Sequence, residues 1–211
     1  MTTISVRTCA AGRRRPESAA AALVAVALAL ALALTAAASA AIPHAQRRRA
    51  AGRCADAHRA IRASSSSALR AAVVCLINRQ RIGRGLPALR ANTDLDRSAE
   101  RWTLEMVSHH EFTHGSNFAS RITAAGFHWS QAGENIAAGY PTPASVVRGW
   151  MASAGHCENI LDPSYRDVGT GLSPGAAIAS APGTWTQDFG LPIGQRPSSD
   201  NTGPAAGCPY R

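Results

Sequence analysis

The stretch from Gly133 to Leu161, which reads GENIAAGYPTPASVVRGWMASAGHCENIL, constrains the fold of this chain more than any other. It opens with a glycine-interrupted segment that is typical of a strand and carries Glu134. Pro143 then starts a helix that we expect to reach Ala154, with its apolar face at Val146, Val147, Trp150 and Met151. His156 follows the glycine that should end this helix. With His114 upstream, we expect the fold to bring His114, Glu134 and His156 into one polar pocket.

Residues 1–40 have the three parts of an export signal. A basic region (Arg13–Arg15) precedes an apolar region (Ala22–Leu34) and a small-residue cleavage site (Ala38–Ala40). The apolar run is about thirteen residues long, whereas a membrane-spanning helix needs roughly 20. We therefore expect a signal peptide rather than a membrane anchor, secretion, and a mature chain from about Ala41 with no transmembrane segment.

The cysteine content of an exported chain favours disulfides. The sequence has five cysteines, and because Cys9 leaves with the signal peptide, four remain. Three pairings are possible, and we prefer Cys54–Cys75 with Cys157–Cys208. The first would join residues 41–64, an Arg/Ala-rich arm ordered mainly around Cys54, to the first helix. The second would tether the C-terminal tail, residues 196–211. No CxxC pair exists, which argues against zinc binding by these cysteines.

The charge is strongly basic, with 22 Lys and Arg residues against 13 Asp and Glu and a formal net charge of +9. Every basic residue is arginine, and the chain is rich in alanine, a pattern that mutational bias toward GC-rich codons explains. The arginines are scattered apart from Arg47–Arg49, and few aromatic residues lie between them. We therefore expect no nucleic-acid partner; attraction to anionic cell-surface polymers fits the charge better.

Apolar spacing predicts the remaining elements. A helix should begin after Ser65–Ser67 and stop at Gly83, with Arg81 facing water. A second helix should be capped by Thr93 or Asp94 and run to about His109. A third, short helix is predicted at residues 119–125 and a turn at 159–163. Three strands are predicted at residues 131–138, 166–172 and 184–189. Helices first and strands later indicate a layered α+β domain, which we expect to be a monomer.

Residues 110–114 read HEFTH, a literal HExxH motif. On a helix, this spacing places two histidines on one face as zinc ligands, with Glu111 as the general base. Here the motif falls at the expected end of a helix, directly before Gly115. An HExxH peptidase is therefore an alternative, and we interpret His110 and Glu111 as an accidental match beside His114.

A set of motifs in order resembles the CAP superfamily, which comprises cysteine-rich secretory, antigen 5 and pathogenesis-related 1 proteins, and in particular its short bacterial secreted members. The similarity runs from about Ala68 to Gly190. It rests on CLINRQR, the F-x-H of Phe112 and His114, GENIA at 133–137, VVRGWMASAGHCENIL at 146–161, DVGTGL at 167–172 and WTQDFG at 185–190.

The resemblance implies an α+β fold for residues 65–195, a three-layer α-β-α sandwich with a small central antiparallel sheet flanked by helices. It also implies a cleft with two histidines and two acids. His114, Glu134 and His156 match three of these positions, and Ser153 stands at the second acidic position. Asn135 and Gln187 are further candidate cleft residues. His114 and His156 are candidate ligands of a divalent cation, zinc or calcium, and with serine in place of an acid the affinity should be modest.

The function that the resemblance implies is that of a secreted bacterial CAP-domain protein whose His/Glu cleft binds a ligand or a divalent cation, with no residue assigned to catalysis. One alternative is a metal-assisted hydrolase or peptidase, with His114 and His156 as ligands and Glu134 as base. Another is a cell-wall interaction module. The candidate partners are accordingly a lipid, a small molecule or a cell-wall polymer.

Overall fold

The computed structural model describes residues 53–197 and 207–208. The predicted signal peptide, the first part of the arm and most of the tail lie outside these residues. The chain divides into two units, Met1–Ala50 and Ala51–Arg211, and all described residues belong to the second.

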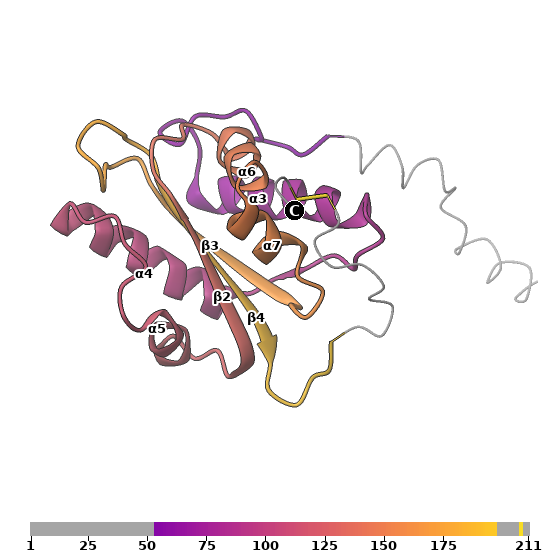
Figure 1. Ribbon diagram of the computed structural model, residues 1–211. Coiled ribbons are helices and arrows are strands. Elements are labelled where there is room, and N and C mark those ends of the chain that lie inside the picture. The colour runs from indigo at the N-terminus through magenta and orange to yellow at the C-terminus, as the bar shows by residue number, and fades with distance from the viewer. Residues whose placement is uncertain (1–52, 198–206, 209–211) are drawn as a thin grey trace, which may run out of the picture. The chain divides into compact units, whose positions relative to one another are not determined.

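The second unit is a sandwich of helices around one sheet (Figure 1). Its elements, in order, are α3 (Ser66–Ile82), β1 (Arg90–Ala91), α4 (Thr93–His109), α5 (Phe118–Ala124), β2 (Trp129–Ala137), α6 (Pro143–Met151), α7 (Ala154–Leu161), β3 (Asp167–Ser173) and β4 (Thr184–Pro192). Helices α4 and α5 cover one face, and α3, α6 and α7 cover the other. The expected α-β-α layering is therefore present. Among the described residues, no helix is long and apolar enough to cross a membrane.

The sheet has the strand order β1-β3-β4-β2. β4 pairs antiparallel with both β2 and β3, and the two-residue strand β1 pairs in parallel with β3. β2 is therefore an edge strand, which matters for the site because its outer edge is open to side chains from both helical layers.

The main core lies between the sheet and the layer of α3, α6 and α7. Trp150 of α6 and Trp185 of β4 are its largest side chains, and both are fully buried. The apolar stripe of α3 (Leu69, Val73, Ile77) packs into the same core. Burial of this kind stabilises by about 1.5–3 kcal/mol per large apolar side chain, which is what holds the layers together.

The sequence predicts that α3 exposes Arg81, and this prediction is wrong. Arg81 is 0% exposed, and its guanidinium donates to the carbonyl oxygens of Pro87 (2.8 Å), Ile160 (2.8 Å) and Asp162 (2.7 Å). The guanidinium thus supplies the hydrogen bonds that water would otherwise donate to the carbonyl groups at the end of α7. Burial lowers the pKa of Arg81 to about 10, so it remains charged at neutral pH.

The predicted helix over residues 143–154 is instead two helices. α6 ends at Met151, Ala152 stays helical, and Ser153 is extended (φ −111°, ψ 128°) as the N-cap residue of α7. His156 therefore lies in the first turn of a new helix, not after a helix end, and the turn predicted at 159–163 is largely the second half of α7. The new direction of α7 carries Ile160 and Leu161 into the core.

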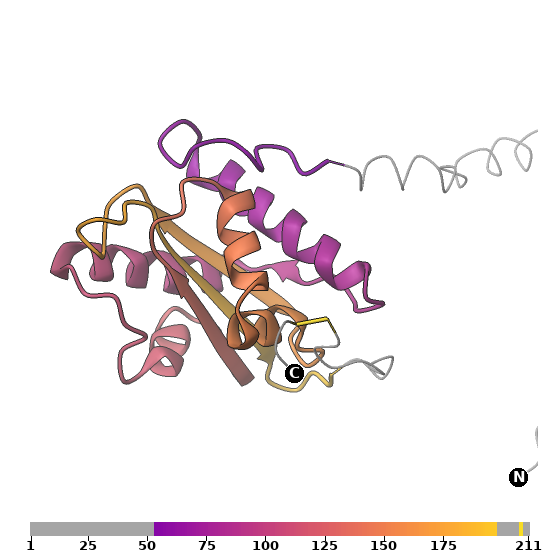
Figure 2. The ribbon, with the colours of Figure 1, turned by 45° about the horizontal axis from the view of Figure 1, so that its top comes forward.

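The structure contains the disulfides Cys54–Cys75 and Cys157–Cys208, the pairing preferred from the sequence. The described part of the arm is more ordered than we expected. Ala57 and Ile61 are buried, the Ile61 N–H donates to Pro141 O (2.8 Å), and the Ala57 carbonyl accepts from Ala144 N (2.8 Å). Figure 2 shows this indigo segment beside α3. The arm thus fastens α3 to the start of α6.

Candidate functional site

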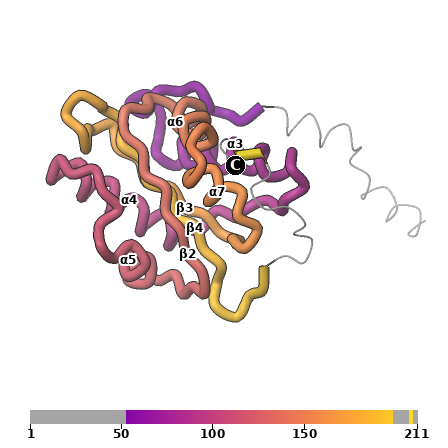
Figure 3. Tube along the Cα trace, viewed as in Figure 1, coloured from indigo at the N-terminus to yellow at the C-terminus, as the bar shows by residue number. Residues whose placement is uncertain are grey.

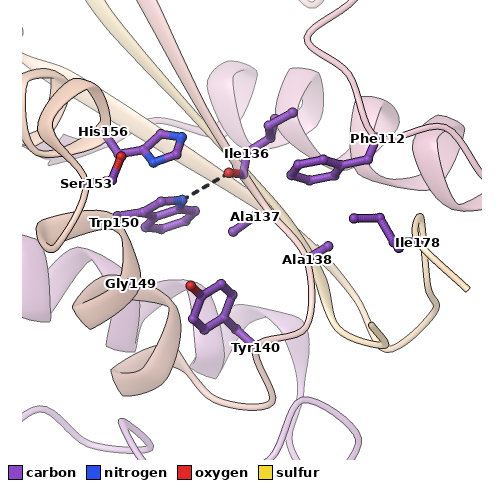
Figure 4. A pocket seen from close by; sticks show the side chains of 10 residues that line it. All are labelled: Phe112, Ile136, Ala137, Ala138, Tyr140, Gly149, Trp150, Ser153, His156 and Ile178. Carbon is purple, nitrogen blue, oxygen red and sulfur yellow. Dashed lines mark hydrogen bonds between the residues drawn. The ribbon is translucent and has the colours of Figure 1, made fainter. Parts of the chain in front are cut away.

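A groove of about 270 Å³ opens where β2 ends (Figure 4). Its floor is the end of β2 and the residue after it, Ile136–Ala138. On one side of the strand lie Phe112 and Ile178, and on the other lie Trp150 and Tyr140. The groove therefore crosses the open edge of the sheet, and most of its lining is apolar.

Two loops bring Phe112 and Ile178 to the groove. The C-cap residue of α4, His110, adopts the left-handed conformation (φ 54°), and the chain turns away so that Phe112 follows two residues later. The β3–β4 loop, which carries Ile178, lies beside this end of α4 (Figure 3), where His110 Nδ1 is 3.2 Å from Ala176 O. Both apolar side chains are large and about 40% exposed (Phe112 40%, Ile178 42%), and both line the same groove.

The other wall is fixed by Trp150. Its indole is 1% exposed, and its N–H donates to Ile136 O (3.3 Å), a carbonyl on the outer edge of β2. Asn159 of α7 donates to the Glu134 carbonyl in the same way (3.1 Å). These two bonds satisfy edge carbonyls without a further strand, so the edge of β2 is held against α6 and α7.

Ser153 and His156 form the polar end of the groove. Because Ser153 is the N-cap residue of α7 and His156 lies three residues later, one helical turn presents both side chains. Burial, followed by electrostatic repulsion between the His114 and His156 imidazoles, lowers the pKa of His156, so its imidazole is mostly neutral at pH 7. A neutral imidazole and a hydroxyl can both donate and accept hydrogen bonds.

His114 lies on the opposite face of β2, where it contacts Glu134. His114 Nδ1 is 2.8 Å from Glu134 Oε1, and Arg121 Nη2 of α5 is 2.6 Å from Glu134 Oε2. The Glu134 side chain is 2% exposed and that of His114 is 49% exposed. Since the carboxylate accepts, Nδ1 carries the hydrogen, and Nε2 is the ring nitrogen left for other partners.

Arg121 and Trp102 support this pair, and sequence reasoning missed the role of both. The Arg121 guanidinium stacks 3.8 Å from the centre of the Trp102 ring and also donates to His114 O (3.1 Å). The Trp102 N–H donates to Thr113 O (3.0 Å). Gly115 (φ 65°) lies against the Trp102 ring, where a Cβ would come within 3.0 Å. These contacts fix the loop that carries His114.

The predicted single pocket is thus two polar groups on opposite faces of β2. Along a strand, successive side chains alternate between faces, so Glu134 points to α5 while Asn135 points to α7. His114 and His156 approach the strand from these two sides. They remain near enough for the charge of one to act on the other.

Asn135 and Gln187 are both 0% exposed and lie in the interior behind the groove. Asn135 Nδ2 donates to His156 O (3.2 Å) and Gln187 Oε1 (3.3 Å), and its Oδ1 accepts from Asn159 (2.9 Å). This network joins β2, β4 and α7. Its effect on the site is indirect, because it sets the position of the backbone at His156.

The HExxH alternative fails on geometry. Its first histidine, His110, is the left-handed residue that ends α4, so the motif does not lie on a helix and the two histidines do not share a helical face. Within residues 53–197 and 207–208, no group of three or more His, Cys, Asp or Glu side chains is placed to hold a metal ion.

The atoms free to coordinate a metal ion determine which cation His114 and His156 could bind. Both oxygens of Glu134 are engaged, by His114 and Arg121, which leaves imidazole nitrogens as the available donors. Calcium requires six to eight oxygen ligands, so these residues do not fit it. Zinc accepts imidazole nitrogen, and a histidine whose other nitrogen donates to a carboxylate is its usual protein ligand. His114 has this arrangement.

The chain matches the family model described as "CAP: Cysteine-rich secretory protein family" over residues 74–189. It is 37% identical over 131 residues to the uncharacterized protein YkwD of Bacillus subtilis, a match that covers 60% of this chain and 48% of YkwD. This chain thus spans about half the length of that relative.

Two solved structures share the fold. An extracellular SCP-domain protein of Bacillus anthracis aligns with a TM-score of 0.52 and 22% identity, over 60% of this chain and 44% of that one. An outer surface protein of Borrelia burgdorferi aligns with a TM-score of 0.52 and 19% identity, over 57% of this chain and 90% of that one. From the family match, the ordered motifs and the shared sandwich, this chain belongs to the CAP, or cysteine-rich secretory protein, family.

Proposed function

We propose that this chain is an exported protein whose groove binds a small ligand with an apolar body and a polar end. The observation that carries the proposal is the lining of the groove, which has exposed Phe112 and Ile178 at one end and Ser153 with His156 at the other. Ligand sites in proteins are concave and mostly apolar, with a few polar groups that orient the ligand. Two disulfides support export, since such bonds persist in oxidising compartments.

The polar end predicts a pH-dependent preference between two simple probes, octanoate and 1-octanol. Because the pKa of His156 is lowered, the imidazole is neutral at pH 7 and becomes a cation only in more acidic solution. We expect octanoate to bind more tightly as the pH falls from about 7 to about 5, because imidazolium then pairs with carboxylate. Binding of 1-octanol should change little. Isothermal calorimetry or competition for a fluorescent fatty acid measures both.

Two variants test the location of this binding. Ala138→Phe should fill the groove and lower the affinity for both probes at least tenfold. Ala71→Phe, at an exposed position on α3, should leave both affinities unchanged. His156→Gln should keep 1-octanol binding and lose the pH dependence for octanoate. Equal binding to wild type and Ala138→Phe would refute the groove as the site.

A second candidate is a zinc ion bound by His114 and His156. The observation that favours it is the His114–Glu134 pair, which fixes the imidazole with Nε2 free, together with a second neutral imidazole nearby. Bound zinc would act there as a Lewis acid. The residues themselves would supply two nitrogens, a fixed tautomer and a nearby hydroxyl at Ser153.

Zinc titration by calorimetry separates this candidate from adventitious binding. Ligand histidines must be neutral, so zinc affinity should fall as the pH falls below about 6. We expect His156→Ala to lower the affinity at least tenfold and His110→Ala, an exposed histidine outside the pair, to leave it unchanged. Equal heat from the wild type and His156→Ala would exclude the site, and loss in His110→Ala would return the HExxH motif to consideration.

A further inference from the structure

A buried acid that the groove does not use lies directly behind Glu134. Asp188 of β4 is the antiparallel partner of Glu134 in the register of β2 and β4. Side chains of directly opposite residues share one face of the sheet, with Cβ atoms about 4.5–5.5 Å apart. The two carboxyl groups therefore lie side by side between the sheet and the layer of α4 and α5.

The surroundings do not balance two negative charges. The Glu134 side chain is 2% exposed and Asp188 is 1% exposed. The guanidinium of Arg121 is the permanent cation that acts on both groups, and it is already joined to Glu134, as is the imidazole of His114. On the other sides of Asp188, Ser98 of α4 offers a hydroxyl, and its β3 partner Gly169 has no side chain.

Asp188 also lacks the hydrogen bonds that an ionised carboxylate requires. Among the described residues, neither Asp188 oxygen nor Ser98 Oγ has a hydrogen bond of ordinary geometry. An ionised carboxylate buried without donors costs several kcal/mol or more, whereas the neutral acid is itself a donor. Its carboxylate neighbour, Glu134, is an acceptor.

We propose that Glu134 and Asp188 share one proton, held on Asp188 and donated to Glu134, and that this carboxyl pair positions the imidazole of His114. The pair then carries a single negative charge, which Arg121 balances. Burial first, and then the charge of Glu134, raises the pKa of Asp188 well above its usual value, while Ser98 and Arg121 oppose the shift. Two adjacent buried carboxyl groups commonly behave in this way.

Asp188 is accordingly a positioning residue. Its proton holds one side of Glu134, Arg121 holds another, and Glu134 in turn keeps the hydrogen of His114 on Nδ1. The half-exposed imidazole is left with Nε2 free for other partners. This assignment is independent of which ligand occupies the groove.

The shared proton can be observed directly in the full chain with both disulfides formed. With aspartate labelled with ¹³C, the Asp188 carboxyl resonance is identified by its absence from Asp188→Asn. We expect it at the position of a protonated acid at pH 7 and ionising only at higher pH. A resonance at the carboxylate position at neutral pH would overturn the proposal.

A second variant distinguishes a shared proton from an isolated buried acid. In Glu134→Gln the neighbouring charge is gone and Arg121 is free to pair with Asp188. We expect the pH at which Asp188 ionises to fall. An unchanged midpoint would show that burial alone holds the proton, and sharing would be ruled out.

The ¹⁵N shifts of the His114 imidazole test the positioning role. Asp188→Asn retains a donor toward Glu134 and should leave the Nδ1–H tautomer dominant. Asp188→Leu removes the donor and should increase the population of the other tautomer. Identical His114 spectra in all three proteins would show that Asp188 does not act through Glu134; if Asp188→Leu does not fold, the Glu134→Gln midpoint still decides the question.

Discussion

Replacing Gly171 by alanine is expected to destabilise the domain by roughly 3 kcal/mol or more, at or above the upper end of ordinary overpacking costs. Gly169 and Gly171 of β3 allow α4 to approach the strand directly. A Cβ at Gly169 would meet the backbone of Asp96, and one at Gly171 would meet Ala99 O, both far inside van der Waals contact. The obstacle is helix backbone rather than a flexible side chain, so relief requires α4 to move as a whole.

Moving α4 would also break hydrogen bonds that depend on this approach. β1 pairs with β3 only as far as Val168. Beyond it, Thr170 N donates to Asp96 Oδ1 (2.7 Å) and Leu172 N to Glu100 Oε2 (3.0 Å). The carboxylates of α4 thus take the place of a neighbouring strand, and buried N–H groups left without them cost about 1–3 kcal/mol each.

Thermal unfolding followed by circular dichroism measures the effect. A loss of about 3 kcal/mol should lower Tm by about 6–12 °C in a protein of this size. Gly155→Ala is the matched control, because a Cβ there meets nothing within 4 Å and the residue is helical. It should be neutral or slightly stabilising. A Gly171→Ala protein as stable as this control would mean that the contact between α4 and β3 is looser than described.

The sequence predicted elements best where local signals agree with tertiary structure. α4 has a clear apolar stripe and ends at His109 as predicted, and its cap is Asn92, one residue before the predicted Thr93 or Asp94. The junction of α6 and α7 has no such signal, since residues 149–155 contain no proline and are mostly compatible with helix. The break at Ser153 is set by the core contacts of α7, which a local pattern does not contain.

The prediction was wrong where the charge of a residue and its position in the helical repeat pointed to different environments. Arg81 follows Leu69, Val73 and Ile77 at intervals of four residues, so periodicity places it on the buried face of α3. Its charge suggested water instead. Asp188 was missed for a related reason: β4 is a central strand covered on both faces, and all but the last of its residues are buried, so no alternation separates Asp188 from its neighbours.

The candidate site was predicted in part. His114, Glu134 and His156 were identified by motif, and the structure brings His114 to Glu134 but places His156 across β2. Arg121 and Trp102 could not be assigned to the site from one sequence, because their roles depend on how α5 packs against α4 and β2. Contacts between residues that are distant along the chain cannot be predicted from the local pattern of apolar and polar residues.

The buried arginine supplies the second large effect. Arg81→Met should destabilise the domain by about 3 kcal/mol, although methionine can fill much of the space. The variant leaves the carbonyls of Pro87, Ile160 and Asp162 without their donors, and each such group costs about 1–3 kcal/mol. Removal of a desolvated cation offsets part of that cost. Arg81→Lys should also destabilise, since one ammonium cannot reproduce the planar set of donors.

Arg79→Met is the matched control, two residues away on the same helix turn. Arg79 is exposed and, among the described residues, makes no side-chain hydrogen bond or ion pair, so its replacement should change stability by no more than about 0.5 kcal/mol. Urea unfolding of the three variants and the wild type measures the differences. If Arg81→Met and Arg79→Met unfold at the same urea concentration, the guanidinium does not join α3 to the end of α7.

Because α7 carries His156, loss of this link should also weaken octanoate binding in Arg81→Met and leave it intact in Arg79→Met.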